Sequence, residues 1–479
     1  MIGLIQNDER YDYDIRTLLQ AFYENEKIVP ARDNTRMQLT VTFQEEGEHQ
    51  AVFQTEDGSV IKRSFSGDYR DKMLTRNTVK EAIYSILCEA CGHTLPWGTL
   101  TGIRPVKIIT GYLEQGCSEQ EALARFKKDY VASDQKAELS LEVAKKEQEI
   151  IKGIDYDRQY SLYIGIPFCP SRCLYCSFTS YPLTLYEEYV DTYLSALFRE
   201  IDFAKDAMKG RHVNSIYIGG GTPTSLTAGQ LNRLLHKIEA SFDLSYMREF
   251  TVEAGRPDSI TKDKLAAILE SPATRISINP QTMNDQTLKL IGRNHTVEQV
   301  KETFYLAREM GFDNINMDLI MGLLGENEQM VAHTLSEIEA LSPDNLTIHS
   351  LAIKRAANLN TRREEYEHVA RGTTNEMLLM ADRTARTLSM KPYYLYRQKN
   401  IPGNFENVGY ARTGKEGIYN ILIMEEKQTI LALGAGAASK YVFGKGQRIE
   451  RTENVKDVKL YVERIDEMIK RKCDMLESM

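Results

Sequence analysis

The sequence predicts an α/β protein built around an open, incomplete barrel of six strand–helix units. From Ser161 onward, short runs rich in β-branched residues alternate with longer amphipathic helical patterns. This alternation is typical of βαβ units and a parallel sheet. Polar residues and glycines gather where the runs end, and barrels of this kind carry their chemistry at the carboxyl ends of the strands.

Six runs qualify as strands of this barrel, which we place in residues 156–355. The predicted strands are Leu162–Ile166, Ser215–Ile218, Phe250–Glu253, Arg275–Ile278, Ile315–Ile320 and Leu346–Leu351. The predicted helices between them are Leu185–Ala207, Gln230–Ala240, Lys262–Leu269, Val297–Met310 and Met330–Leu341. Because a closed barrel has eight such units, six indicate an open relative of it.

Residues 1–155 are predicted to form an N-terminal α+β accessory domain. Strand-like runs at Met37–Phe43, Ala51–Phe53 and Val60–Phe65 predict a small β-meander. Helical patterns are found near Tyr13–Tyr23, from Lys72 to Cys91 and from Ser133 to Lys152. Gly153 then marks a helix end and the border of the domain.

Residues 356–479 are predicted to be a C-terminal extension that completes the site. The pattern is helical from Thr374 to Met390 and strand-like at Tyr393–Tyr396 and Thr429–Leu433. A last helix, Val455–Leu476, carries an apolar stripe, so we expect it to pack on the barrel.

Composition excludes several classes of function. The 479 residues suggest two or three domains, and the formal net charge of -8 gives no general attraction to nucleic acid or anionic membranes. No apolar run approaches the roughly 20 residues of a membrane span. The first residues lack the pattern of a secretory signal, and seven cysteines without a paired framework suit a reducing compartment. We expect a cytoplasmic protein.

Three cysteines, Cys169, Cys173 and Cys176, follow the first predicted barrel strand within eight positions. A structural zinc site needs four closed ligands, and no fourth Cys or His lies nearby. A disulfide fits poorly, because three is an odd number and the compartment is expected to be reducing. The third hypothesis is a [4Fe–4S] cluster with one iron left open for a small chelating molecule.

The spacing Cys169-x-x-x-Cys173-x-x-Cys176, with Tyr175 before the last cysteine, resembles the signature of radical S-adenosylmethionine (SAM) enzymes. The preceding Tyr163–Phe168 resembles the oxygen-independent coproporphyrinogen III oxidases and their relatives. Thr101–Pro105 resembles a segment of the HemZ-type branch. The resemblance covers Ser161 to Tyr441 and implies a partial (β/α)6 TIM-like barrel. It also implies a [4Fe–4S] cluster with three Cys ligands and one or two bound SAM molecules.

The resemblance further implies which residues form the site. Contacts to cluster-bound SAM are expected from Tyr163, Gly220, Glu253, Gln281, Arg293, Asp318 and Ala352. A second SAM would lie against Tyr175, Gly221 and Thr222. In the late segment, which also carries the resemblance, Ala438 is expected to bind cofactor, and Tyr163, Tyr419 and Asn420 are the catalytic candidates.

Tyr396-Arg397-Gln398-Lys399 is either a solvated strand end or a basic edge for the propionates of a tetrapyrrole. Two departures separate the chain from the better-known decarboxylases, which have His at the position of Gly165 and a fourth cysteine at that of Phe178. The chain also ends soon after Ser439, where those enzymes continue into a C-terminal domain.

The first functional hypothesis is oxidative decarboxylation of two propionates of coproporphyrinogen III to vinyl groups, which gives protoporphyrinogen IX for haem biosynthesis. This needs a tetrapyrrole substrate and an electron donor such as flavodoxin or ferredoxin. The alternatives are a haem-binding carrier of the same family without decarboxylase activity and a radical SAM enzyme that acts on another tetrapyrrole.

Overall fold

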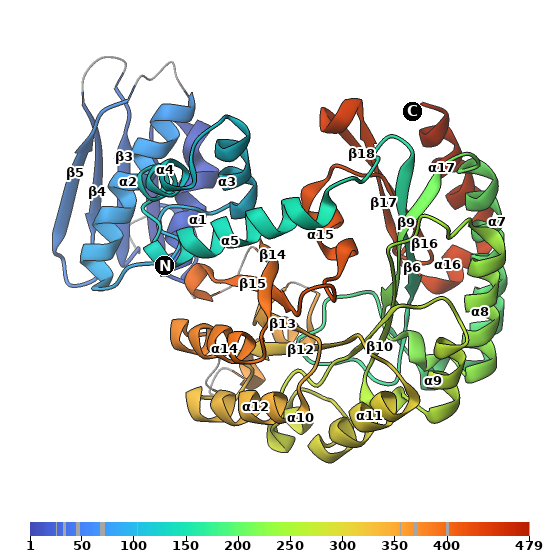
Figure 1. The fold of residues 1–479 in the computed structure, drawn as a ribbon. Coiled ribbons are helices and arrows are strands. Elements are labelled where there is room, and N and C mark those ends of the chain that lie inside the picture. Colours follow the sequence, from blue (N-terminus) through green and yellow to red (C-terminus); the bar gives the residue numbers. More distant parts are fainter. Residues whose placement is uncertain are drawn as a thin grey trace.

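The computed structural model describes residues 1–24, 26–31, 35–44, 48–67, 72–102, 104–354, 356–366, 369, 372–398 and 402–478. Figure 1 shows an N-terminal sheet with its helices on the left, the barrel on the right and helix α5 (Asp134–Ile151) between them. None of the helices within these ranges is long and apolar enough to cross a membrane.

The six predicted barrel strands are all present, and they lie side by side in chain order as a parallel sheet. They are β6 (Gln159–Ile166), β9 (His212–Gly220), β10 (Glu249–Gly255), β11 (Arg275–Ile278), β12 (Ile315–Met321) and β13 (Asn345–Ser350). Apolar side chains of these strands, such as Leu162, Ile216 and Ile276, are fully buried. The prediction of an α/β partial barrel is therefore confirmed.

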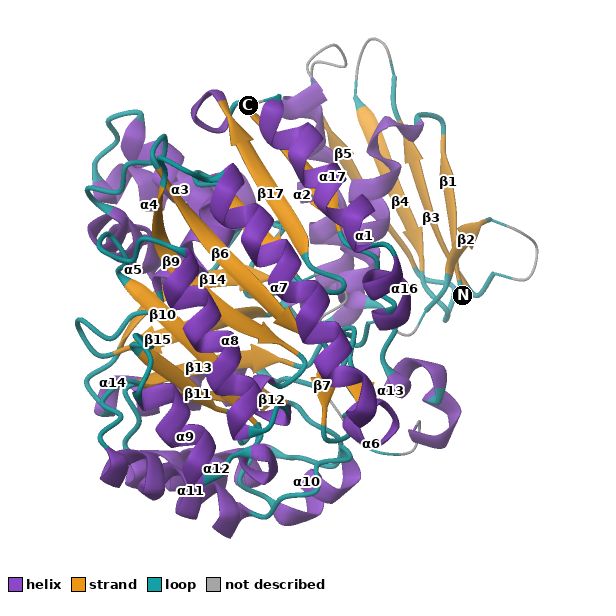
Figure 2. Ribbon diagram, turned by 90° about the vertical axis from the view of Figure 1, so that its right-hand side faces the viewer, coloured by secondary structure: helices purple, strands orange, loops and turns teal. Residues whose placement is uncertain are grey.

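The barrel helices cover the outer face of this sheet, and Figure 2 shows α7 and α8 lying across it. They are α7 (Val190–Ala207), α8 (Ala228–Ser241), α9 (Lys262–Leu269), α10 (Asp285–Leu290), α11 (Val297–Met310) and α12 (Glu328–Leu341). The predicted helix from Leu185 is divided, because a separate short helix, α6 (Leu183–Tyr186), and a 3-10 turn precede α7.

Strands from the C-terminal part extend both edges of the barrel sheet to eleven strands. On one edge, β16 (Ile430–Leu433) pairs parallel with β6 and is followed by antiparallel β17 (Ala438–Phe443) and β18 (Arg448–Glu453). On the other edge, β15 (Glu406–Ala411) pairs antiparallel with β13 and with β14 (Lys391–Arg397). The sequence did not predict β15, β17, β18 or the short helix α15 (Ile418–Glu425).

The remaining C-terminal helices are α13 (Asn358–Thr361), α14 (Asn375–Thr387), α16 (Val458–Glu463) and α17 (Ile465–Glu477). The predicted last helix is thus two helices, because the backbone leaves helical geometry at Arg464. Both pack against α7, as expected for helices that cover the barrel.

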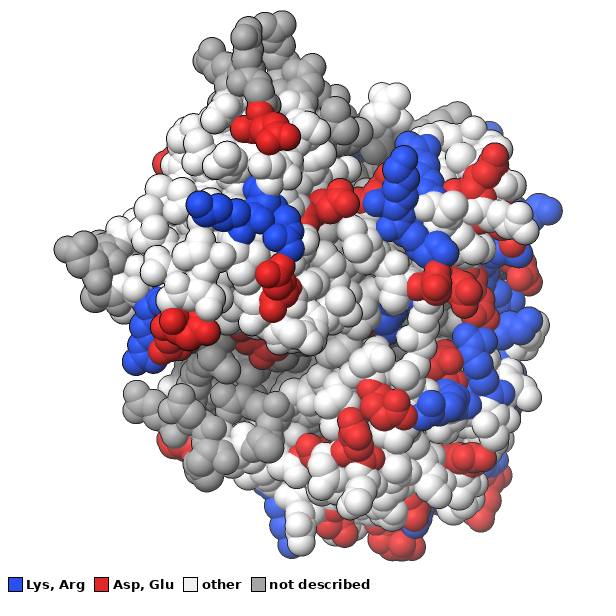
Figure 3. Space-filling view, turned by 90° about the vertical axis from the view of Figure 1, so that its left-hand side faces the viewer, with Lys and Arg blue, Asp and Glu red and all other residues white. Residues whose placement is uncertain are grey.

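The N-terminal sheet has the order β2-β1-β3-β4-β5. Its strands are β1 (Ile2–Gln6), β2 (Ile28–Pro30), β3 (Met37–Thr42), β4 (His49–Gln54) and β5 (Val60–Phe65). The predicted meander β3–β5 is confirmed, and β1 and β2 add a parallel pair at its edge. Helices α1 (Asp12–Phe22) and α2 (Lys72–Cys91) pack beside it. On this side of the molecule, basic and acidic side chains are interspersed (Figure 3).

Residues 97–151 connect the N-terminal sheet to the barrel through α3 (Pro105–Glu114), α4 (Glu119–Tyr130) and α5. Most of their buried apolar side chains share one hydrophobic core with the barrel, whereas residues 2–95 surround a core of their own. The indole Nε1 of Trp97 donates to Glu406 Oε2 at 2.7 Å, and Lys136 pairs with the other oxygen. Glu406 begins β15, so this buried pair fixes the connection to the barrel edge.

Candidate active site

A cavity of about 460 Å³ opens at the carboxyl ends of the barrel strands. It brings together every predicted site residue except one. Those that line it are Tyr163, Cys169, Cys173, Tyr175, Cys176, Gly220, Gly221, Thr222, Glu253, Gln281, Arg293, Asp318, Ala352, Tyr419 and Asn420. The exception is Ala438, which does not line the cavity. It begins β17, pairs with Glu453 and is exposed.

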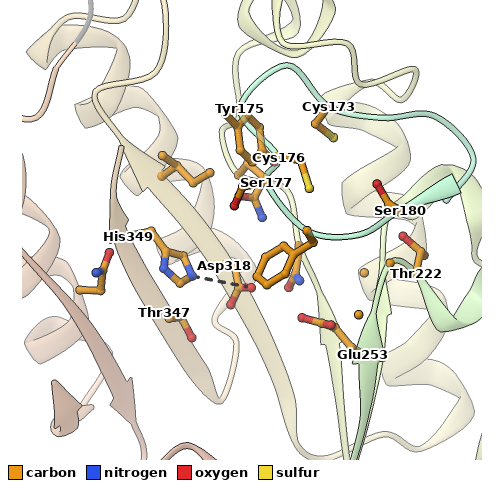
Figure 4. A pocket seen from close by; sticks show the side chains of 18 of the residues that line it. Cys173, Tyr175, Cys176, Ser177, Ser180, Thr222, Glu253, Asp318, Thr347 and His349 are labelled. Atoms are coloured by element: carbon orange, nitrogen blue, oxygen red, sulfur yellow. Dashed lines mark ion pairs between the residues drawn. The ribbon is translucent and has the colours of Figure 1, made fainter. Parts of the chain in front are cut away.

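The three cysteines lie on one closed loop above the cavity. Two short strands, β7 (Phe168–Cys169) and β8 (Tyr181–Pro182), pair with each other and fix the two ends of the loop. Its middle is held by the Leu174 N–H, which donates to the carbonyl of Ile291 at 2.9 Å. Figure 4 shows Cys173 and Cys176 on this loop, facing the strand ends that carry Glu253 and Asp318.

The chemistry of the loop fits an iron–sulfur cluster. All seven cysteines are free thiols. Burial raises the pKa of Cys169 to about 11 and also raises that of Cys176, so a bound metal is needed to hold them as thiolates. Within the described ranges, no three His, Cys, Asp or Glu side chains converge on one metal ion. A four-iron cluster does not require this convergence, because its thiolates bind different irons.

The turn that carries Gly220, Gly221 and Thr222 is packed directly against the cysteine loop. The N–H of Gly221 donates to the Ile166 carbonyl, and that of Thr222 to the Phe168 carbonyl, both at 2.7 Å. Gly220 has φ +107°, in the region that favours glycine. The hydroxyl of Thr222 lies 3.5 Å from Cys169 Sγ. The turn therefore positions the first cysteine as well as one wall of the cavity.

Replacing Gly221 by alanine is expected to destabilise this turn by about 1–3 kcal/mol, as for other overpacked sites. A Cβ atom there would lie 2.5 Å from the Phe168 carbonyl oxygen and 2.9 Å from that of Ile166, and backbone atoms cannot rotate away. Thermal unfolding and SAM binding by calorimetry measure the effect. The control is Gly229→Ala on α8, where a Cβ meets nothing within 4 Å. Equal thermal stability and equal SAM affinity of the two variants would contradict the predicted backbone clash at Gly221.

Two half-buried carboxylates, Glu253 on β10 and Asp318 on β12, differ in their pKa. Burial, and then the charge of Asp318, raise the pKa of Glu253 to about 7, although the Tyr217 hydroxyl donates to it at 3.2 Å. Burial also opposes the charge of Asp318, but its interaction with His349 outweighs this and keeps its pKa below the ordinary value. The His349 Nε2 lies 3.9 Å away, and the Asn316 amide donates at 2.7 Å. Asp318 therefore carries the negative charge at neutral pH.

The raised pKa of Glu253 predicts a pH-dependent stability. Between pH 4.5 and about 7 the folded protein binds more protons at this group than the unfolded chain. The free energy of unfolding therefore falls as the pH rises through this window. Relative to wild type, Glu253→Gln should gain about 2–3 kcal/mol between about pH 5 and pH 8.

Urea denaturation of the metal-free protein at both pH values measures this gain. Glu298→Gln, at an exposed position of α11, is the control and should follow the wild-type curve. If the Glu253→Gln and wild-type curves stay parallel, the carboxyl of Glu253 is not protonated in this window.

Two further predicted residues have unusual surroundings. Gln281 has φ +70°, and its backbone bridges to β12 through bonds to Asp318 and Ile320 of 2.9 and 3.0 Å. Arg293 is buried and donates to the Asn279 carbonyl, while its Nε has no hydrogen-bond partner among the described residues. A guanidinium held in this way can bind a carboxylate.

Several cavity residues were missed in the sequence. Tyr217 forms a triangle of stacked rings with Tyr163 and Tyr419. Its ring centroid lies 6.3 Å from that of Tyr163 and 4.8 Å from that of Tyr419, and the last two are 6.3 Å apart. Arg275 is buried, and its Nε and Nη2 have no hydrogen-bond partner among the described residues. Others that line the cavity are Phe178, Arg256, Asn316, Thr347, His349, Lys354, Tyr394 and Tyr396. Strand alternation could have placed Tyr217, which is two residues from Gly219, on the inner face.

The hypothesis of a basic edge for propionates is not supported at Arg397. Its guanidinium is buried outside the cavity, over the ring of Trp97 at 5.2 Å, and donates to the Leu100 carbonyl at 2.7 Å. Lys399 lies outside the described residues. Tyr396 and Gln398 do line the cavity.

Comparisons with known proteins agree with this geometry. The family model described as the radical SAM superfamily matches residues 163–338. The chain is 39% identical over 485 residues to the oxygen-independent coproporphyrinogen-III oxidase-like protein HemZ of Bacillus subtilis, covering 99% of this chain and 97% of that one. It is 32% identical over 312 residues to the heme chaperone HemW of the same organism, covering 64% and 76%.

The fold is also shared with a solved structure. Coproporphyrinogen III oxidase (HemN) from Escherichia coli superposes with a TM-score of 0.52 at 24% identity, covering 67% of this chain and 73% of that one. The near-full-length match to HemZ shows which family the chain belongs to. The chain therefore belongs to the radical SAM superfamily and, within it, to the HemZ-type branch of the oxygen-independent coproporphyrinogen III oxidase family.

Proposed function

We propose that the protein is an oxygen-independent coproporphyrinogen III dehydrogenase that converts two propionates of its substrate to vinyl groups, giving protoporphyrinogen IX. The observation that carries the proposal is that cysteine thiols and the buried guanidinium of Arg275 line the same cavity, and that Nε and Nη2 of this guanidinium have no hydrogen-bond partner among the described residues. Thiolates of this spacing hold a radical-generating cluster, and a buried guanidinium is suited to a substrate carboxylate.

The residues of this chain have distinct roles in the proposal. Cys169, Cys173 and Cys176 would hold the [4Fe–4S] cluster, which together with SAM supplies a 5′-deoxyadenosyl radical for hydrogen abstraction. Arg293 would bind the carboxylate of SAM, and the charged Asp318 would bind its ammonium group or ribose hydroxyls. Because Gly220 and Gly221 have no side chains, their backbone would allow SAM to approach closely. The stacked tyrosines around Tyr217 would exclude water.

Anaerobic turnover tests this function. Reconstituted protein is given SAM, a one-electron donor such as flavodoxin or ferredoxin, and coproporphyrinogen III. Protoporphyrin after oxidation of the product, formed together with 5′-deoxyadenosine and methionine, is the expected result. Formation of 5′-deoxyadenosine without protoporphyrin would contradict the assignment of coproporphyrinogen III as the substrate. It would favour a radical SAM reaction on another tetrapyrrole.

The role of Arg275 gives a sharper prediction. Truncating one partner of a buried charge pair costs about 2–5 kcal/mol, so Arg275→Gln should raise the KM for coproporphyrinogen about 30-fold or more. SAM binding should stay near wild type, because Arg293 is untouched. Arg275→Lys keeps the positive charge but loses the forked geometry of the guanidinium, so its KM for coproporphyrinogen should lie between those of wild type and Arg275→Gln. A fall in SAM affinity equal to the rise in KM would place Arg275 at the cofactor.

A haem carrier is the second candidate, because the heme chaperone HemW is 32% identical over 64% of this chain. The distinguishing measurement is haem titration of the reconstituted protein. Stoichiometric haem binding with no porphyrin product under the turnover conditions would favour the carrier.

A further inference from the structure

Arg256 is a buried residue that contacts the cysteine loop and lines the cavity, and no role has been assigned to it so far. It directly follows β10, and its side chain is 3% exposed. Its Nη1 donates to the carbonyl of Ser171 at 3.0 Å and to the Ser171 hydroxyl at 2.8 Å. The same nitrogen lies 3.8 Å from Cys173 Sγ, within range of a hydrogen bond to sulfur. One arm of the guanidinium therefore faces a cysteine proposed as a cluster ligand.

The other arm is fixed by a bidentate ion pair. Nε donates to Asp258 Oδ1 at 3.0 Å and Nη2 to Oδ2 at 2.7 Å. The buried ring of His295 lies against the same carboxylate, with Nδ1 3.8 Å from Oδ1. Because this fork is held on its far side, Nη1 stays aimed at the loop. The cation thus lies between the carboxylate and the sulfur, with its positive side toward Cys173.

This order of charges has an electrostatic consequence for a bound cluster. Hydrogen bonds to the sulfurs and nearby charge are among the factors that set the reduction potential of iron–sulfur clusters. Reduction adds one negative charge, which a neighbouring cation stabilises. Arginine is always protonated in proteins, and a buried cation is little screened by water.

We propose that Arg256 raises the reduction potential of the cluster through its contact with Cys173, and that Asp258 both orients Arg256 and moderates its effect. Arg256 is a positioning and tuning residue that acts through Cys173. The inference rests on the cluster and not on the tetrapyrrole, so it holds for the decarboxylase and for any other radical SAM activity of this site.

The reduction potential tests it without turnover. Reconstituted wild type, Arg256→Gln and Ser171→Ala are titrated anaerobically with mediators, and the reduced cluster is followed by electron paramagnetic resonance. The equilibrium constant for reduction should fall about tenfold in Arg256→Gln, equivalent to about 59 mV for one electron. Ser171→Ala loses a loop contact but keeps the cation, and should change this constant less than about twofold.

Asp258→Asn separates an electrostatic role from a structural one. It removes the counter-charge and leaves the guanidinium, so it should shift the potential in the opposite direction to Arg256→Gln. It also supplies the test if Arg256→Gln fails to retain iron. A wild-type potential in Arg256→Gln with full iron and sulfide content, or a downward shift in Asp258→Asn, would overturn the proposal.

Discussion

Replacement of Cys173 by serine is expected to remove the iron–sulfur cluster and to lower 5′-deoxyadenosine formation by at least about a thousandfold, because the radical step has no other source of its electron. Cys173 is buried on a loop whose ends and middle are fixed by β7, β8 and Ile291. A serine hydroxyl is a hard, protonated group and a poor ligand for iron in this setting. Two thiols from so short a loop leave two irons without protein ligands.

Iron and labile-sulfide content, the visible spectrum and paramagnetic resonance of the reduced protein measure the loss directly. Cys117→Ser is the matched control, because Cys117 is a half-buried free thiol beside the hydrophobic core and does not line the cavity. It should retain the full cluster. A Cys173→Ser protein with wild-type iron content and activity would refute the assignment of this loop to a cluster.

The parts of the site that sequence could predict are those fixed by short-range pattern. The three cysteines lie within one loop, so their proximity needed no knowledge of the fold. Glu253 lies near the end of β10 and Asp318 lies in the middle of β12. The apolar, β-branched runs of both strands are visible in sequence, and parallel strands of a barrel place such side chains on one side of the sheet. Chain order and strand order coincide from β6 to β13, so no long-range pairing had to be inferred.

The parts that sequence could not predict depend on long-range pairing. β15 has the sequence ENVGYA, which lacks a strand-like alternation, and it exists because β13 and β14 hold it from both sides. Ala438 lies outside the cavity lining because the chain turns at Gly434 and Gly436, both at positive φ, before it enters β17. Trp97 and Glu406 bond across 309 positions, and no local pattern in either segment indicates the other. The guanidinium of Arg397 packs over the ring of Trp97 and does not line the cavity.

Replacement of Lys472 by methionine is expected to lower the free energy of unfolding by about 3–5 kcal/mol, because it leaves a buried carboxylate without its counter-charge. Lys472 on α17 and Glu200 on α7 form an ion pair of 2.8 Å, and their side chains are 1% and 0% exposed. Glu200 also accepts from the Gly434 N–H at 2.8 Å and from the Tyr461 hydroxyl at 2.6 Å. Urea denaturation monitored by circular dichroism measures the change.

The double variant Glu200→Gln, Lys472→Met distinguishes an uncompensated charge from lost packing. It removes both charges and should recover most of the stability lost in the single variant. Lys237→Met is the surface control, since its pair with Asp202 lies at the surface, with side chains 28% and 57% exposed, and surface pairs contribute about 0–1 kcal/mol. No recovery in the double variant would assign the loss to packing of α17.

The loss of the ion pair in Lys472→Met should also affect the active site, because Glu200 accepts a hydrogen bond from the turn at Gly434. A Cβ at Gly434 would lie 2.5 Å from the Gly165 carbonyl oxygen, so this turn packs against β6 immediately before the cysteine loop. The Tyr193 hydroxyl bonds both segments, donating to the Gly165 carbonyl at 2.6 Å and accepting from the Ala435 N–H at 3.2 Å. Lys472→Met should therefore also lower iron retention on mild heating, whereas Lys237→Met should not. The C-terminal helix then supports the cysteine loop through one buried ion pair.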